Sequence, residues 1–201
     1  MVELAGLSIL NLDYSALLAL PCACRAGRGL MAPNLAMIVD VVDERNRTVG
    51  VAERRSLFQR KLGFRTVDIL LFDKNDRMVL QLLPPDHLRN PNRLGASVAG
   101  YLRAGETYLE AARRKLRAEL HITARIRSTG QFEMIDEGCR KFVGVFVGKL
   151  HQRPAFNVDE IAELVYLDTK EVERRVSNRP GDFTPTFLLA YEHLRRWKRD
   201  R

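Results

Sequence analysis

The sequence has no long hydrophobic run. None of its 201 residues belongs to an uninterrupted apolar stretch of about 18 residues, the length that a transmembrane helix needs. The apolar segment 7–20 is interrupted by Asn11 and Asp13, and no cationic segment precedes it, so it does not fit a secretory signal peptide. We therefore expect no membrane partner.

Cysteine is scarce as well. The three cysteines, Cys22, Cys24 and Cys139, are odd in number and too few for a disulfide scaffold. Cys22 and Cys24 have no second cluster of cysteine or histidine at metal-ligand spacing, which argues against a zinc site. We expect a reducing, cytoplasmic setting and an incidental thiol at Cys139.

Acidic residues are outnumbered by basic ones, 25 to 33, which gives a formal charge of +8. This balance favours anionic partners such as nucleotides, diphosphates or nucleic acid. The densest basic run covers residues 195–199. It either complements the dipole of a C-terminal helix or belongs to a polyanion site, and charge alone does not choose between them.

The pattern of apolar residues predicts one globular domain. We assign residues 1–36 to a poorly ordered N-terminal extension and residues 37–201 to the domain. Alternating and continuous apolar segments predict strands at 37–42, 65–72, 77–83, 95–101, 130–134, 142–147 and 164–167. Helical spacing predicts helices at 107–120, 170–176 and 186–198, the second of them capped by Thr169.

The first of these helices has the clearest pattern. Its apolar residues recur at helical spacing and should form one buried stripe, consisting of Leu109, Ala112, Leu116 and Leu120.

The segment 100–122 joins a glycine loop to this helix, and it resembles the Nudix box. In that box a glycine is followed after five residues by glutamate, and after seven more by an Arg-Glu pair, a Glu-Glu pair and a glycine. The matching residues stand in register without a gap: Gly100, Glu106, Arg114, Leu116, Glu119 and Ile122. Lys115 stands in place of the glutamate that follows the arginine, Ala118 in place of the first glutamate of the pair, and His121 in place of the glycine.

The resemblance implies an α/β (α+β) fold, a Nudix-type α/β/α sandwich with a mixed sheet. It also implies a hydrolase that acts on a diphosphate-containing small molecule with Mg²⁺ or Mn²⁺. Carried over by position, Glu119 is the catalytic residue and main metal ligand. Glu106, the Gly100 carbonyl and the loop acid Glu160 are further metal ligands. Lys115 and Arg103 are candidate ligand-binding residues, and Arg114 orients a box carboxylate.

The helix explains what the substitutions change. Positions 115, 118 and 119 share one face, where three carboxylates would form a site for a hard cation. Here Lys115 and Ala118 reduce three negative charges to none overall. Lys115 also lies four residues before Glu119, close enough to pair with it. We therefore expect weak metal binding and impaired catalysis.

Segments 39–50, 157–161 and 183–187 resemble the Nudix branch that includes isopentenyl diphosphate isomerase. That enzyme needs a cysteine before the box glycine and a histidine after it, and these positions hold Ala99 and Tyr101. The acidic pair expected near residues 139–141 is also absent. Isomerase chemistry by that mechanism is not expected.

Two functions remain open from the sequence. One is a diphosphate hydrolase with weakened catalysis, and the other is a non-catalytic Nudix-fold module that binds a diphosphate ligand, RNA or a protein. The histidines His87, His151 and His193 lack partners in the sequence and are expected at the surface. Neither the substrate nor the oligomeric state can be read from these residues.

Overall fold

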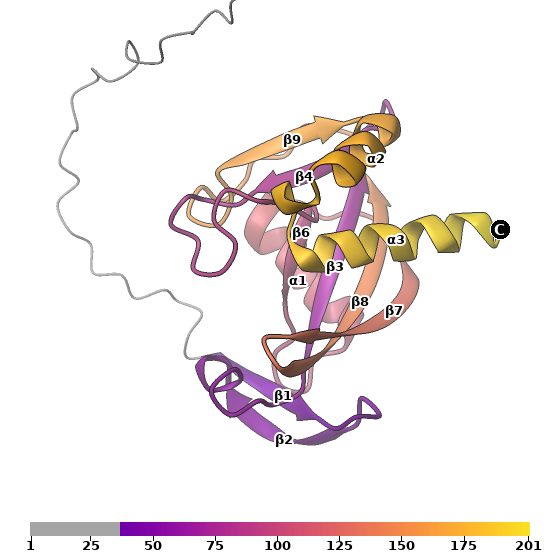
Figure 1. Cartoon of the computed structure of the whole chain (residues 1–201). Coiled ribbons are helices and arrows are strands. Elements are labelled where there is room, and N and C mark those ends of the chain that lie inside the picture. Colours follow the sequence, from indigo (N-terminus) through magenta and orange to yellow (C-terminus); the bar gives the residue numbers. More distant parts are fainter. Residues whose placement is uncertain (1–36) are drawn as a thin grey trace, which may run out of the picture. The chain divides into compact units, whose positions relative to one another are not determined.

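The computed structural model describes residues 37–201, which fall within one compact unit, Pro33–Arg201. Seven strands form the main sheet in the order β5-β4-β3-β8-β7, with β6 beside β3 and β9 beside β4 (Figure 1). These strands are β3 (Phe64–Phe72), β4 (Met78–Leu82), β5 (Leu94–Gly95), β6 (Val98–Tyr101), β7 (Ile126–Asp136), β8 (Cys139–Lys149) and β9 (Glu163–Leu167). The Cys22 and Cys24 positions and the predicted extension lie outside the described residues.

Strand β3 is the centre of this sheet. It pairs in parallel with β8 along its whole length, and antiparallel with β6 over Thr66–Ile69 and with β4 over Leu71–Phe72. Eight of its nine residues are buried. A strand covered on both faces reads as a continuous apolar run, which is why the sequence identified it so clearly.

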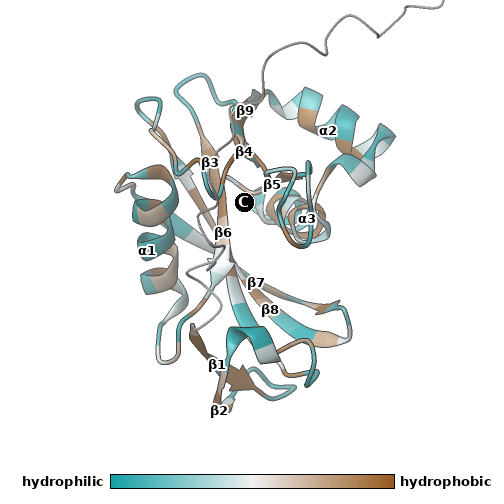
Figure 2. Ribbon diagram, turned by 90° about the vertical axis from the view of Figure 1, so that its left-hand side faces the viewer, coloured by the Kyte–Doolittle hydropathy of each residue, from teal (hydrophilic) through white to brown (hydrophobic). Residues whose placement is uncertain are grey.

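Helices cover both faces of the sheet. Helix α1 (Tyr108–Leu120) lies on one face and α3 (Pro185–Arg199) on the other (Figure 2). On the α1 side Val67, Ile69 and Leu71 pack with the helix, while Leu70 and Phe72 pack on the α3 side. Helix α2 (Thr169–Asn178) adds Val172 to the α3-side core. The predicted α/β/α sandwich with a mixed sheet is therefore confirmed.

A separate two-stranded sheet is formed by β1 (Ile38–Val42) and β2 (Thr48–Glu53). It is joined to β3 by the short 3-10 helix η1 (Arg54–Ser56). The Val42 amide donates to the Gly63 carbonyl at 3.0 Å. A Cβ on Gly63 would stand only 2.4 Å from the carbonyl oxygen of Val42. Glycine at position 63 therefore permits the close approach of these two backbone segments.

The buried stripe of α1 differs from the prediction by one residue. Ala112, Leu116 and Leu120 are buried as expected, but Leu109 is 36% exposed and Ala111 is fully buried. The prediction at Leu109 was wrong because the buried face of α1 runs through residues 111–112, 115–116 and 119–120, and Leu109 lies at the edge of that face. Small residues at 111 and 112 let the helix backbone approach the sheet.

The boundaries of the other elements also needed correction. Asp168, not Thr169, caps α2, because its side chain accepts the Glu171 amide at 2.8 Å. Strand β7 is longer than predicted, and the polar turn after it shrinks to two residues, Glu137 and Gly138, both with positive φ. Cys139 therefore begins β8, and it is fully buried.

Helix α3 begins at Pro185, after Thr184 as N-cap, and the 3-10 helix η2 (Pro180–Asp182) precedes it. Among residues 37–201, no helix is both long and apolar enough to cross a membrane.

Candidate functional site

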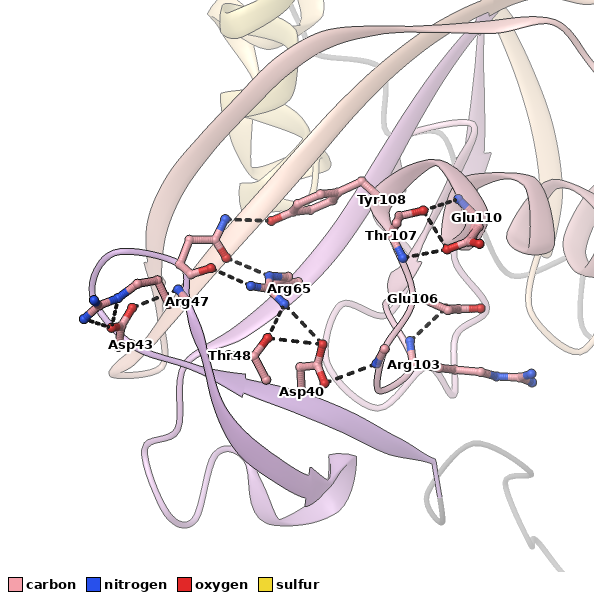
Figure 3. Close-up of polar contacts among 12 residues, drawn as sticks. Asp40, Asp43, Arg47, Thr48, Arg65, Arg103, Glu106, Thr107, Tyr108 and Glu110 are labelled. Carbon is pink, nitrogen blue, oxygen red and sulfur yellow. Dashed lines mark hydrogen bonds and ion pairs between the residues drawn. The ribbon is translucent and has the colours of Figure 1, made fainter.

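The loop between β6 and α1 enters the helix through a capping box. The Thr107 hydroxyl accepts the Glu110 amide at 3.3 Å, and the Glu110 carboxylate accepts the Thr107 amide at 2.8 Å (Figure 3). This reciprocal pair satisfies two backbone donors that a helix start leaves open. The threonine and glutamate of the Glu-Thr-Tyr-Leu-Glu run thus fix where the helix begins.

Glu106 and Arg114 fasten the loop to the helix. The Arg114 guanidinium donates to both carboxylate oxygens of Glu106, at 2.6 and 2.7 Å, and to the Tyr101 carbonyl at 3.0 Å. Burial alone would raise the pKa of Glu106, but the Arg114 hydrogen bonds and the Arg103 amide hold it below its ordinary value. Glu106 is therefore an ionised carboxylate already held by two donors.

Lys115 and Glu119 form a buried ion pair on the next turn of α1, as their spacing predicts. Lys115 Nζ contacts Glu119 Oε1, and the two side chains are only 10% and 4% exposed. The lysine stem lies directly over Gly100, where a Cβ would stand 2.4 Å from Lys115 Cε. The absence of a side chain at position 100 is what gives the lysine room on this face.

Glu119 has one oxygen without a partner. Its Oε2 atom is buried and makes no hydrogen bond within residues 37–201. Burial raises the pKa of Glu119, the charge and hydrogen bond of Lys115 act in the opposite direction, and the charge of Glu160 raises it further. A carboxylate held this way is more weakly acidic than an exposed one and keeps a free acceptor atom.

Glu160 is brought to the same region by a turn. The Asn157 amide donates to the Glu119 carbonyl at 2.8 Å, and the Glu160 amide donates to the Asn157 carbonyl at 3.1 Å. Glu160 is half-buried and close enough to Glu119 to influence its pKa. The predicted loop acid and the predicted main ligand therefore lie together.

The other predicted residues lie around this pair. The Arg103 amide donates to Glu106 Oε2 at 2.8 Å, while its exposed side chain extends away from the loop in Figure 3. Ala118 is exposed beside Glu119. His121 ends α1 with φ 53°, a left-handed conformation that suits glycine, which explains why the box pattern places a glycine there.

The described side chains around this pair offer few oxygen ligands for Mg²⁺ or Mn²⁺. Such a site takes several oxygen ligands, yet no cluster of three or more histidine, cysteine, aspartate or glutamate side chains with suitable geometry occurs within residues 37–201. Glu106 is held by Arg114, and one oxygen of Glu119 is held by Lys115. Only Glu119 Oε2 and Glu160 remain as side-chain ligands.

A polar network missed by the sequence analysis joins the small sheet to the box loop (Figure 3). Arg65 donates to Asn46 Oδ1 at 2.7 Å, to Thr48 at 3.0 Å and to Asp40 at 3.2 Å. Asp40 in turn accepts the Gly105 amide at 3.2 Å. Arg65, the one cation in the run 65–72, was the signal that could have revealed it.

A second missed group is buried on the α3 side of β3. Asp68 is 2% exposed, and burial raises its pKa to about 6 despite the charge of Lys141. Thr66, two residues earlier on the same face, has a buried hydroxyl without a partner within residues 37–201. Lys141 donates to Thr186 Oγ1 at 2.7 Å and lies 3.3 Å from Asp136. A lone aspartate inside an apolar strand was the available signal.

The histidines are less exposed than predicted. His87 and His193 are half-buried, while His151 is exposed. His193 Nε2 lies 3.0 Å from the Thr129 carbonyl, and burial lowers the pKa of His87. All three keep some exposure at the surface.

Comparison with known proteins decides the family. The NUDIX domain family model matches residues 63–187, which is more than half of the chain. The chain belongs to the Nudix family. Its similarity to a Nudix hydrolase of Yersinia pestis, described as uncharacterized, is 30% identity over 153 residues, or 76% of this chain and 82% of that one.

Two further proteins are similar to this Nudix chain, one in structure and one in sequence. The crystal structure of DR0079 from Deinococcus radiodurans matches with a TM-score of 0.68 at 25% identity, covering 77% of this chain and 98% of that one. Isopentenyl-diphosphate Delta-isomerase 2 of Photorhabdus laumondii is 22% identical over 175 residues, 81% of this chain and 97% of that protein. The predicted resemblance to both Nudix hydrolases and the isomerase branch is confirmed.

In this Nudix chain the two positions that flank the box glycine have no isomerase-type side chains. Ala99 has no thiol, and the Tyr101 ring stacks on Phe64 with centroids 5.3 Å apart. The Arg54 guanidinium lies 4.5 Å from the centre of the same ring. Tyr101 therefore packs against the small hydrophobic cluster that contains Val39, Leu57 and Phe64.

Proposed function

We propose that this Nudix protein acts on a diphosphate-containing small molecule, such as a nucleoside diphosphate linked to another group, with catalysis weakened relative to a complete box. The observation that carries the proposal is the buried Lys115–Glu119 pair over Gly100. The segment keeps the spacing of the box, but Lys115 and Ala118 stand where the box has two of its carboxylates. The name of the Photorhabdus laumondii relative, an isopentenyl-diphosphate isomerase, supports a diphosphate substrate.

The roles of the residues follow from their contacts. Glu119 provides a buried carboxylate oxygen without a hydrogen-bond partner among residues 37–201 and is the proposed catalytic residue, with Glu160 as an acidic neighbour. Arg114 and Glu106 hold the loop that would surround the diphosphate. Lys115 and the exposed Arg103 supply positive charge toward an anionic ligand. Mg²⁺ or Mn²⁺ is expected to bind weakly, because the side-chain ligand set is small.

The test is hydrolysis of a substrate panel. Purified protein is incubated with nucleotide sugars, dinucleotides and prenyl diphosphates, each with Mg²⁺ or Mn²⁺, and product release is measured. We expect slow turnover of at least one class, lost in Glu119→Gln and retained in Glu163→Gln, whose exposed acid lies on β9. No turnover of any compound by the wild-type protein would refute the hydrolase proposal.

A second candidate is a binding module without catalysis. It is favoured by the absence of a three-residue metal cluster within the described part of the chain. In this case the wild-type protein binds ADP-ribose or another diphosphate without added metal, and Lys115→Met weakens that binding. The double variant Lys115→Glu with Ala118→Glu should then gain metal-dependent hydrolysis. Failure to bind any diphosphate in metal-free buffer would exclude this candidate.

A further inference from the structure

A hollow of about 1000 Å³ lies on another part of the domain, between the C-terminal half of α3, the start of β7 and the end of β8. We call it the α3 groove. The residues that define it here are Arg125, Arg127, Lys149, Trp197 and Lys198. His121 and Ile122, at the end of the box segment, border it, but Lys115 and Glu119 do not line it, so it is a different site from the Lys115–Glu119 pair.

The charge of the α3 groove is strongly positive. Two arginines and two lysines line it, whereas Asp76 is its only acidic lining residue and pairs with Lys149. Among residues 37–201, Arg125, Arg127 and Lys198 form no ion pair with a carboxylate. Uncompensated cations gathered around a hollow attract an anionic ligand.

The groove also contains an aromatic surface that cations already contact. The Arg127 guanidinium lies 4.6 Å from the centre of the Trp197 ring, and that of Arg201 lies 3.9 Å from it. Lys198 Nζ lies 4.7 Å from the centre of the Phe72 ring. An aromatic base that stacks on the indole would replace a guanidinium group, which could then bind a phosphate.

The helix dipole does not account for this arrangement. It favours cations in the last turn of α3, and Arg195 and Arg196 of the same run are paired with Glu173 and Glu192. Arg125, Arg127 and Lys149 come from other elements, yet they line the same hollow. Convergence from several elements indicates a site.

We propose that the α3 groove binds single-stranded nucleic acid, with phosphates on Arg125, Arg127 and Lys198 and a base against Trp197. A positively charged groove with an aromatic platform is the arrangement that single strands need. Several cations spread over a hollow of about 1000 Å³ exceed what one mononucleotide requires. The inference is independent of the proposed diphosphate activity.

The experiment uses the full chain and a fluorescein-labelled single-stranded oligouridylate. Because the sequence has one tryptophan, quenching of its emission reports directly on Trp197, while anisotropy of the label measures affinity. We expect saturable quenching and binding that weakens with salt. Arg127→Gln with Lys198→Gln should weaken binding about tenfold and reduce the logarithmic salt slope by about 1.4, at roughly 0.7 per phosphate contact.

The matched control removes the same charge outside the groove. Arg195→Gln with Arg196→Gln alters two cations of α3 that do not line it, and it should leave affinity within about twofold. Equal weakening by both double variants would overturn the proposal, because binding would follow net charge alone. Absence of binding at low salt, or equal affinity for uridine monophosphate, would also overturn it. Hydrolysis of the substrate panel should be the same in all these proteins, so the two proposals fail separately.

Discussion

Removing the lysine of the buried pair should destabilise the protein far more than removing a surface cation. In Lys115→Met the Glu119 carboxylate stays buried, with 4% side-chain exposure, but loses its positive partner. Leaving one member of a buried ion pair uncompensated costs about 3–5 kcal/mol. We therefore expect a loss of that size in the free energy of unfolding at pH 7, measured by urea denaturation.

The cost should also depend on pH. Burial raises the pKa of Glu119 above its ordinary value of 4.5, and loss of Lys115 raises it further. A folded pKa above the unfolded one means that stability falls as the pH rises past about 4.5, when ionisation begins in the unfolded chain. The penalty of Lys115→Met should thus be largest at neutral pH and shrink toward pH 4.5.

A matched pair of variants controls this experiment. Arg196 and Glu192 form an i, i+4 pair on α3 with side chains 61% and 55% exposed, so Arg196→Met should cost no more than about 0.5 kcal/mol. Replacing both members of the buried pair, Lys115→Met with Glu119→Leu, should recover most of the loss. A cost for Lys115→Met as small as that for Arg196→Met would show that Glu119 does not depend on Lys115 to remain buried.

Three further predictions concern other positions. Burial raises the pKa of Asp68 from its ordinary value of 3.8 to about 6, so the contribution of Asp68 to wild-type stability should fall by about 2.5 kcal/mol between pH 4 and pH 8, at about 1.36 kcal/mol for each pKa unit. Asp68→Asn should lack this fall in urea titrations, and an unchanged pH profile would contradict the assignment. Gly100→Ala should displace Lys115, because the new Cβ would lie 2.4 Å from Lys115 Cε, and loss of the ion pair should cost about 3 kcal/mol in the free energy of unfolding. In a Lys115→Ala background the same change should cost little. Equal costs in the two backgrounds would contradict this explanation. His121→Gly should raise stability by about 1 kcal/mol, because residue 121 has φ 53°, a left-handed conformation that costs histidine more than glycine. A lower melting temperature of the variant would show that the backbone is not strained at this residue.

The sequence predicted the fold where local patterns and tertiary structure agree. Strand β3, the β3–β4 hairpin and helix α1 were located to within a few residues, because their apolar runs have the period of the element that buries them. Leu109 was assigned wrongly because helical spacing identifies a stripe without showing where the core ends. Thr169 was assigned wrongly because Asp168, one residue earlier, is an equally good cap.

The candidate site was predicted only in part. The i, i+4 spacing of Lys115 and Glu119 was sufficient to predict their pairing, but not that both would be buried over Gly100. The Arg65 network joins residues of two separate sheets, and the buried Asp68 lies near Lys141 of β8, a strand distant in sequence. The α3 groove is lined by residues of β7, β8 and α3, so the basic run 195–199 alone could not predict it.

We propose that Lys115 supplies, beside Glu119, the positive charge that a metal ion would bring to this position. A calorimetric titration with Mg²⁺ and Mn²⁺ tests it most directly, comparing the wild-type chain with Lys115→Glu combined with Ala118→Glu, and adding Glu119→Gln to that variant as control. Restored carboxylates should bind the metal at least about tenfold more tightly, and Glu119→Gln should remove most of the gain. Equally tight metal binding by the wild-type chain would show that Lys115 does not replace the charge of a metal ion.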